Sequence, residues 1–339
     1  MSRSTRIARR LGWVLIIASL ALHFLTVLAY SRQPDSLAAF TVVPLWVWAG
    51  FGLSASIAAF LAFRAPLSLI VTAVWALTVL LGSDEAKVIA NLGNSAPLPG
   101  PPAPHRGTVP LRVITLNCAQ FRFGDPGPDL AAWQPDIVFI QEADLVRVQQ
   151  LARQIFGPAA HYRAYALNGI ASRFPITREV RNPHPEFRFF NHNATLRLPD
   201  GRSIELVNIH LSSAATDLSL WRPDCWQTHR LNRQKRRLET AIALGILEDT
   251  TDFPGIQPVI MAGDFNAPAA DPIRRQWSGD FEDCFERAGT GWGNTFQRRV
   301  PILRLDRILV TRHFTPVRCR AVTTRKSDHR FVVADVLLD

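Results

Sequence analysis

Apolar residues are concentrated at one end of the chain. Three long apolar stretches, residues 11–30, 40–63 and 65–82, fill most of the first 90 positions. The first two are long enough to cross a bilayer as helices, and the third is close to the lower limit of about 17 residues. The pattern predicts a transmembrane segment over residues 1–90 with about three helices.

Beyond residue 110 the apolar runs are shorter and alternate with polar positions. Two stretches with apolar residues at helical spacing predict helices over residues 144–156 and 230–249. Runs rich in Val, Ile and Leu predict strands over residues 111–117, 136–142, 203–211, 258–265, 306–310 and 331–338. Strands with intervening helices indicate an α/β or α+β sandwich.

Proline separates these two parts of the chain. Six prolines lie in residues 95–110, a composition typical of a stiff, extended linker. We therefore predict a linker over residues 91–109 and a globular, catalytic domain over residues 110–339, which is long enough for one large core.

Basic residues at the ends of the apolar stretches predict a topology. The loop 31–39 carries Arg32 and Asp35, the turn before residue 65 carries Arg64, and four arginines precede the first stretch, at positions 3, 6, 9 and 10. The positive-inside rule then places the N-terminus in the cytoplasm, and three crossings place the domain outside it. A cleaved signal peptide is the alternative, but no small-residue cleavage site precedes Ser31. We expect a multi-pass membrane protein with an extracytoplasmic catalytic domain.

Charge and cysteine content narrow the function only a little. The net charge is +10, of which seven basic and three acidic residues in the first 90 positions contribute +4 and the remainder +6. A basic domain suits nucleic acid or lipid head groups, but 35 of 38 basic residues are Arg, a bias that genome composition also produces. The four cysteines lack CxxC spacing, which argues against a zinc knuckle. Outside the cytoplasm at most one disulfide is expected, with Cys225 and Cys284 as the candidate pair.

Polar side chains end four of the predicted strands. Alternation places Asn117 in a row with Val113 and Thr115, and it likewise places Glu142, His210 and the pair Asp264 and Asn266 at the ends of apolar rows. Each case alone fits a strand that meets solvent or an Asx turn. Four such endings predict a common pocket, and its oxygen ligands favour Mg²⁺ or Mn²⁺ over zinc.

Two further segments carry complementary chemistry. Asp306 begins a predicted strand, and Asp328 and His329 precede the last one. A histidine that acts electrostatically needs a carboxylate to fix its tautomer, so a buried Asp paired with His329 would serve that purpose.

The chain resembles the endonuclease/exonuclease/phosphatase superfamily, which includes DNase I, exonuclease III-like apurinic endonucleases, neutral sphingomyelinases and inositol polyphosphate 5-phosphatases. The motifs that carry the resemblance are LNC (116–118), QE (141–142), GIASRFPI (169–176), NIHL (208–211), GDFNAP (263–268), LDRILV (305–310) and SDHR (327–330). They follow the family order from about residue 111 to the end. The resemblance implies a four-layer α/β/β/α sandwich of the DNase I type, here in a membrane-anchored, bacterial-type member.

The resemblance also implies residue roles in metal-dependent phosphoester hydrolysis. It implies that Glu142 holds Mg²⁺ or Mn²⁺, with Asn117 and Asp328 beside it. Asp264 would orient or deprotonate the attacking water and Asn266 would position the water or the phosphate. His210 and His329 would stabilise charge on phosphoryl oxygens, and Asp306 would hold His329 in place.

Three more residues are candidates for substrate binding. Arg173 is expected either to contact substrate phosphate or to form a structural salt bridge. His192 and Asn193 are expected either to line the cleft or to belong to an edge strand.

These features predict a membrane-anchored, metal-dependent phosphoesterase, and they leave its substrate open. Nucleic acid, a phospholipid or sphingolipid, and a small phosphate ester all remain, and tethering at a bilayer favours a lipid. The lipid bilayer is the expected partner, and no obligatory protein partner is evident. The alternative is a non-catalytic, membrane-tethered binding module that retains the fold.

Overall fold

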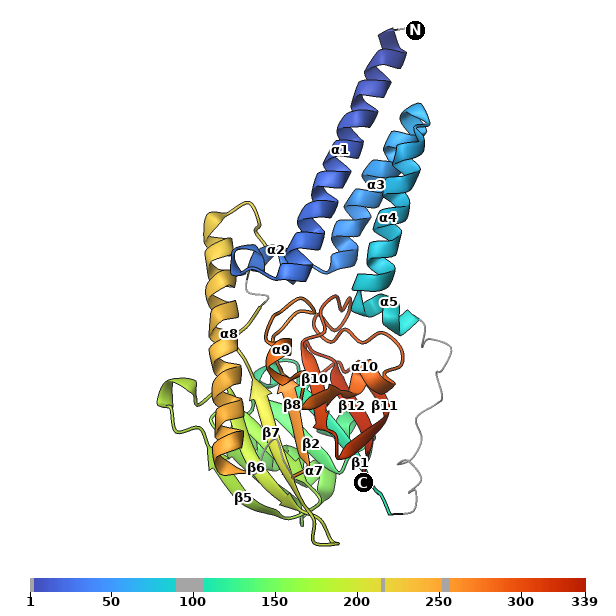
Figure 1. The fold of residues 1–339 in the computed structure, drawn as a ribbon. Coiled ribbons are helices and arrows are strands. Elements are labelled where there is room, and N and C mark those ends of the chain that lie inside the picture. The colour runs from blue at the N-terminus through green and yellow to red at the C-terminus, as the bar shows by residue number, and fades with distance from the viewer. Residues whose placement is uncertain (1–2, 90–106, 215–216, 252–256) are drawn as a thin grey trace. The chain divides into compact units, whose positions relative to one another are not determined.

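A computed structural model describes residues 3–89, 107–214, 217–251 and 257–339 (Figure 1). Contacts divide them into two compact units. The first contains residues 3–89, 217–231 and 268–271, and the second contains the remaining described residues. Most of the predicted proline-rich linker, residues 91–106, lies outside the described residues.

The first unit is built from helices α1 (Arg3–Arg32), α2 (Ala38–Val42), α3 (Leu45–Phe63), α4 (Pro66–Gly82) and α5 (Asp84–Ile89). The stretch 40–63, predicted as one helix, is interrupted between α2 and α3. Pro44 causes the break, because proline lacks an amide N–H and disfavours helical geometry in the residue before it; Val43 is extended.

Helices α1, α3 and α4 pack around one tryptophan. Trp75 of α4 is fully buried, and its Nε1 donates to Ser19 Oγ of α1 at 3.0 Å. A Cβ atom at Gly52 of α3 would lie 2.1 Å from the Trp75 ring, so the helix–helix contact requires glycine there. Ser19 Oγ in turn donates to the Gly52 carbonyl at 2.8 Å.

Two of these helices meet the length and hydropathy expected of a membrane span. The first is Arg6–Arg32 of α1, with a mean hydropathy of 2.3. The second is α3, Leu45–Phe63, with a mean hydropathy of 1.7. Helix α4 is apolar but shorter, at 17 residues. The structure therefore contains two clear candidate spans among the described residues where about three were predicted.

The second unit contains two six-stranded sheets. One has the order β11-β12-β1-β2-β4-β3 and the other β5-β6-β7-β8-β10-β9. The strands are β1 (Val109–Asn117), β2 (Ile137–Gln141), β3 (His161–Tyr165), β4 (Asn168–Ser172), β5 (Ile176–Arg181), β6 (Asn191–Arg197), β7 (Ser203–His210), β8 (Val259–Asp264), β9 (Phe281–Asp283), β10 (Asp306–Thr311), β11 (Phe314–Val322) and β12 (Phe331–Leu338).

The two sheets share one pairing pattern. In each sheet a single parallel pair, β1 with β2 or β7 with β8, is flanked by antiparallel strands. The sheets face each other, and buried amides link them: Asn208 Nδ2 on β7 donates to the carbonyls of Ile140 and Gly169 at 2.9 and 2.8 Å. Gln141 Nε2 donates to Asn208 Oδ1 at 2.7 Å.

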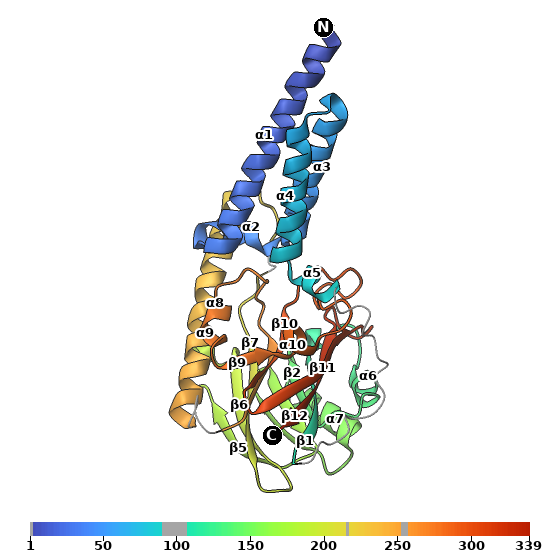
Figure 2. The same cartoon turned by 45° about the vertical axis from the view of Figure 1, so that its right-hand side comes forward.

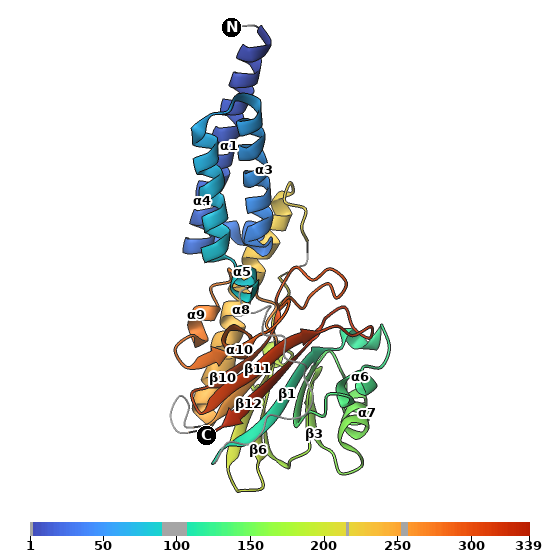
Figure 3. The ribbon, with the colours of Figure 1, turned by 90° about the vertical axis from the view of Figure 1, so that its right-hand side faces the viewer.

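Helices cover the outer faces of both sheets. Helices α6 (Gly127–Ala131) and α7 (Leu145–Phe156) pack on the first sheet, and the second half of α8 (Pro223–Thr250) packs on the second (Figures 2 and 3). The layers are thus helix, sheet, sheet and helix, which confirms the predicted two-sheet α/β fold.

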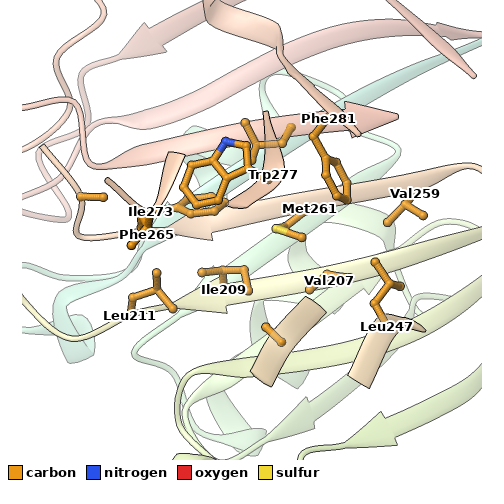
Figure 4. Packing of buried hydrophobic residues seen from close by; sticks show 13 residues of the cluster. Val207, Ile209, Leu211, Leu247, Val259, Met261, Phe265, Ile273, Trp277 and Phe281 are labelled. Atoms are coloured by element: carbon orange, nitrogen blue, oxygen red, sulfur yellow. The ribbon is translucent and has the colours of Figure 1, made fainter. Parts of the chain in front are cut away.

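An apolar cluster lies on the outer face of the second sheet. Alternate residues of β7 and β8, including Ile209 and Met261, point toward this cluster, which also receives Leu247 of α8 (Figure 4). The ring of Trp277, from α9 (Arg274–Trp277), lies 5.0 Å from that of Phe265. Helix α10 (Cys284–Ala288) follows β9. All four cysteines are buried and free, so the predicted disulfide between Cys225 and Cys284 is wrong.

Candidate active site

The strand ends of both sheets bring the polar residues together. In a parallel pair the carboxyl ends lie at the same edge, so β1 and β2 deliver Asn117 and Glu142 together, and β7 and β8 deliver His210 and Asp264. Strands β10 and β12 run antiparallel to β8 and β1, so their starts reach the same edge. Asp306 begins β10, and Asp328 and His329 precede β12.

Asn117 joins the two sheets at this edge. Its Nδ2 donates to Glu142 Oε1 and to Asp264 Oδ2, both at 3.1 Å. Its Oδ1 accepts from the Ala119 amide at 2.9 Å. Asn117 therefore presents a donor to the two carboxylates, which makes it a positioning residue in this arrangement and differs from the predicted role of a metal ligand.

Glu142 reaches the site through a left-handed backbone. Its φ is +56°, a region that non-glycine residues enter rarely and often at functional sites. The row expected to lead to it points elsewhere, because Val138 and Ile140 pack on the helix side of the sheet. The turn at Glu142 redirects its carboxylate toward His210, whose Nε2 lies 3.8 Å from Glu142 Oε1.

Asp264 is held by a tight turn. Asn266, also left-handed with φ +48°, donates its backbone amide to Asp264 Oδ1 at 2.9 Å and its Nδ2 to Oδ2 at 3.2 Å. Asn266 Nδ2 also donates to the Leu211 carbonyl at 2.8 Å, next to His210. The motif that looked like an ordinary Asx turn thus fixes a buried carboxylate in one orientation.

His329 lies between two carboxylates. Its Nδ1 donates to Asp306 Oδ2 at 2.8 Å, and its Nε2 is 3.8 Å from Asp264 Oδ2. Burial alone would lower the pKa of His329, but the charges of Asp306 and Asp264 raise the pKa to about 10. Burial raises the pKa of Asp306, against the opposing charge of His329. An imidazolium near neutral pH follows, with its Nε2–H directed into the site.

Two hydroxyl groups stabilise this arrangement, and one of them, Ser327, was not predicted as a site residue. Ser327 Oγ donates to the Asn117 carbonyl at 2.6 Å and accepts from the His329 amide at 3.0 Å. Thr295 Oγ1 accepts from the amides of Leu305 and Asp306 at 3.1 and 3.2 Å, which fixes the start of β10. Ser327 stands inside the SDHR motif, so its position beside His329 was the available signal.

Two groups of side chains are candidates for binding a divalent cation. Asp264, Asp306 and His329 place ligand atoms within 4.8 Å of one another. His329 Nδ1 is already bonded to Asp306, and an imidazolium cannot bind a metal until it loses its proton. Glu142 Oε2 and Asp306 Oδ1 are both buried without a hydrogen-bond partner, and such an orphaned carboxylate oxygen fits a cation. Because the protonated His329 lies beside Asp306, the Glu142 side of the site suits a divalent cation better.

Asp328 lies next to His329, and its charge contributes to the raised pKa of that histidine. Its carboxylate accepts from Ser327 Oγ at 3.4 Å, and it is half-buried. Asp328 therefore lies at the edge of the site.

The structure contradicts the predicted substrate contact of Arg173. Its Nε pairs with Asp136 Oδ1 at 3.0 Å. Asp136 precedes β2 whereas Glu142 follows it, so Arg173 is roughly 20 Å along the strand from the site at about 3.3 Å per residue. The alternative of a structural salt bridge is the one observed.

His192 and Asn193 lie on β6 and point to opposite faces of the sheet. His192, opposite Asn208, is fully buried, and its Nε2 lies 2.9 Å from Glu179 Oε1. Asn193, opposite Val207, faces the outer cluster side and accepts from Asn191 Nδ2 at 3.1 Å. The two do not line one cleft together, because neighbouring strand residues alternate.

Asn168 was missed by the sequence analysis. It begins β4 opposite Gln141, the residue before Glu142, and its Nδ2 donates to the Phe189 carbonyl at 2.7 Å. Its Oδ1 is buried without a partner. No pattern in the sequence points to Asn168, because it begins β4 and so does not end a row of apolar strand residues.

Comparisons with known proteins identify the family and the fold. Residues 114–329 match the Endonuclease/Exonuclease/phosphatase family. A structure of an endonuclease/exonuclease/phosphatase from Bacteroides vulgatus is 18% identical, with a TM-score of 0.54 over 68% of this chain and 100% of that one. A comparison with curated proteins gave no match.

Two further structures have the same fold and more specific names. A mannosyl-6-phosphatase from Bacteroides thetaiotaomicron is 16% identical, with a TM-score of 0.54 over 67% of this chain and 99% of that one. D. rerio TDP2 complexed with a single-strand DNA product is 18% identical, with a TM-score of 0.50 over 67% of this chain and 98% of that one.

Proposed function

Because the chain belongs to the endonuclease/exonuclease/phosphatase family, we propose that it is a membrane-anchored phosphoesterase that depends on Mg²⁺ or Mn²⁺. The observation that carries the proposal is the pair of His329 and Asp306 facing Asp264 across the strand ends. This arrangement presents a positive donor and an oriented carboxylate to one small volume, which in-line attack of water on a phosphate requires.

Asp264 is the residue that we assign to the attacking water. Its carboxylate is fixed by N–H groups of Asn117 and Asn266, so it can orient the water without moving. Asn266 assists from the same turn. His329 and His210 donate to phosphoryl oxygens as negative charge develops on them, and Asp306 keeps the imidazole of His329 in the required tautomer.

Glu142 is the proposed metal ligand, and Asp328 the candidate second ligand. When bound there, a divalent cation polarises a phosphoryl oxygen. The orphaned Oε2 of Glu142 supports this assignment, and Asn117 holds Oε1 of the same carboxylate.

The membrane attachment is also part of the proposal. We propose that α1, α3 and α4 all cross the bilayer and that the domain 110–339 lies outside the cytoplasm. The mutual packing of the three helices through Trp75 supports a three-helix segment.

The substrate class stays open between nucleic acid, lipid and small phosphate esters. The purified full chain should be assayed with Mg²⁺ or Mn²⁺ against plasmid DNA, sphingomyelin and a generic phosphodiester. His329→Ala and Asp264→Ala should each lower kcat by a factor on the order of 10² to 10³. His313→Ala is the matched control, since His313 follows the far end of β10 and bonds Thr311.

Three outcomes would count against the proposal. Full activity of His329→Ala or Asp264→Ala would remove the mechanism, and activity that resists EDTA would remove the metal. Hydrolysis of none of the three substrates by a folded chain would favour the non-catalytic binding module.

A further inference from the structure

A short segment at the start of α8 exposes apolar side chains to an unusual degree. Trp221 is 82% exposed, the largest value for a large apolar residue in the part of the chain that the structure describes. Leu218 and Leu231 are 48% and 52% exposed. Tryptophan and leucine exposed on one segment are typical of a surface that meets a membrane interface.

The segment is held in shape by α8. The carbonyl of Asp217 accepts from Cys225 Sγ and from His229 Nε2. Trp226 Nε1 donates to the Leu220 carbonyl at 2.8 Å. The backbone of residues 217–222 is therefore fixed to the first turns of the helix, and the exposure of Trp221 does not arise from an unsupported loop.

The charge of the same region suits an anionic surface. Residues 217–239 contain six basic residues and three acidic ones, a net charge of +3, although Arg233 and Arg236 are buried. Arg222 and Arg230 are exposed beside the apolar residues, and Arg222 pairs with Asp224. Basic residues next to exposed Trp and Leu favour anionic lipid head groups over neutral ones.

The position of the segment in the fold identifies its partner. Contacts group residues 217–231 with residues 3–89, the unit that contains both candidate membrane spans. We propose that Leu218, Trp221, Arg222, Arg230 and Leu231 form a docking segment that rests in the head-group region of an anionic bilayer, as a second membrane contact beside the spans. This inference rests on the proposed function, because it takes the membrane attachment as its premise.

The helix that follows this segment also supports a loop of the candidate active site. Helix α8 continues without a break to Glu239, whose carboxylate accepts from the amide and hydroxyl of Ser212 at 2.8 and 2.6 Å. Arg236 Nη1 donates to the Ser212 carbonyl at 3.0 Å. Ser212 lies two residues after His210, so one helix carries both the docking segment and the support of the loop that follows His210.

The test places a fluorescent probe on the segment in the full chain. Trp221→Cys is labelled with nitrobenzoxadiazole in nanodiscs of phosphatidylcholine with phosphatidylglycerol, and quenching by spin-labelled lipid is measured. The native cysteines are all buried, which favours labelling at the introduced thiol. Val146→Cys is the matched control, an apolar position of α7 that is 69% exposed in the other unit.

We expect quenching at position 221 to be several-fold stronger than at position 146, and to weaken in phosphatidylcholine alone and in the double variant Arg222→Gln/Arg230→Gln. Equal quenching at the two positions, or none because the chain does not enter the nanodiscs, would overturn the docking segment. Equal quenching of position 221 in neutral and anionic lipid would overturn its preference for anionic lipid.

Hydrolysis of plasmid DNA, sphingomyelin and the generic phosphodiester by the same samples separates this inference from the proposed function. Hydrolysis without quenching at position 221 would reject the docking segment and keep the enzyme. Quenching without hydrolysis would keep the docking segment and reject the enzyme.

Discussion

At His329, burial and charge act in opposite directions on one imidazole. The carboxylates of Asp306 and Asp264 outweigh burial and raise the pKa to about 10. The group is protonated below that pH and neutral above it. If the imidazolium donates to a phosphoryl oxygen, kcat is present at neutral pH and falls as the pH rises through about 10.

Asp306→Asn should move this alkaline fall to lower pH. The amide removes a negative charge that raises the pKa of His329 but still accepts a hydrogen bond from Nδ1. We expect a lower kcat at neutral pH, a smaller loss than in His329→Ala, and an alkaline limb displaced toward neutrality. The pH–rate profile of a variant that melts at the wild-type temperature measures it, and an unmoved limb would separate the fall from His329.

Glu142→Gln should weaken the binding of the metal without unfolding the protein. The substitution keeps the size of the side chain but replaces a carboxylate whose Oε2 has no hydrogen-bond partner. We expect the Mg²⁺ concentration for half-maximal rate to rise, with partial recovery at high Mg²⁺. The rate is titrated with Mg²⁺ beside Glu248→Gln, an exposed residue of α8; identical titrations would place the cation elsewhere.

The alternation of strand residues predicted how some side chains face the site. It did not predict the turns that bring other side chains there. Asn117, His210 and Asp264 do continue inward-facing rows, because alternation holds to the last residue of a strand. Glu142 and Asn266 arrive through left-handed turns that no periodic pattern encodes. Arg173 forms the salt bridge that was one of its two predicted roles, because β4 runs antiparallel to β2 and its end therefore lies away from the site.

At the level of elements, most central strands were predicted and edge strands were not. The predicted strands β1, β2, β7, β8, β10 and β12 all lie inside their sheets, where burial on both faces favours apolar sequences. The interior strands β4 and β6 were missed, because their sequences NGIAS and NHNATLR are rich in polar residues. The edge strands β3 and β5 are partly exposed and carry Arg, Glu and His. Polar residues at an edge are tolerated because one side meets solvent, and they remove the apolar signal.

Gly263→Ala should loosen the pair of strands that carries His210 and Asp264. Gly263 has φ +149°, and a Cβ atom there would lie 1.9 Å from the Ile209 carbonyl of β7. We expect a loss of roughly 1 to 3 kcal/mol in the free energy of unfolding and reduced activity. Gly279→Ala is the control, because its Cβ meets no atom within 4 Å. Equal melting temperatures for both variants would mean that β7 and β8 tolerate the clash.

At the scale of the whole molecule, the number of crossings decides which compartment holds the site. Apolar composition alone predicted about three membrane-spanning helices. Pro44 interrupts the second apolar stretch, and α4 has only 17 residues, so the number of crossings needs a direct measurement. Two crossings return the chain to the cytoplasm, whereas three leave residues after α4 outside.

A fusion series resolves this count. Alkaline phosphatase, active only after export, should be active when fused after Gly107 and inactive when fused after Arg64, in the turn between α3 and α4. The basic N-terminus fixes the first crossing, and Trp75 ties α4 into contact with α1 and α3, so α4 should cross with them. A cytoplasmic fluorescent reporter at the same two positions should give the opposite signals. Inactive phosphatase at both positions would mean two crossings and a cytoplasmic site, and would direct the search for a substrate to phosphate esters inside the cell.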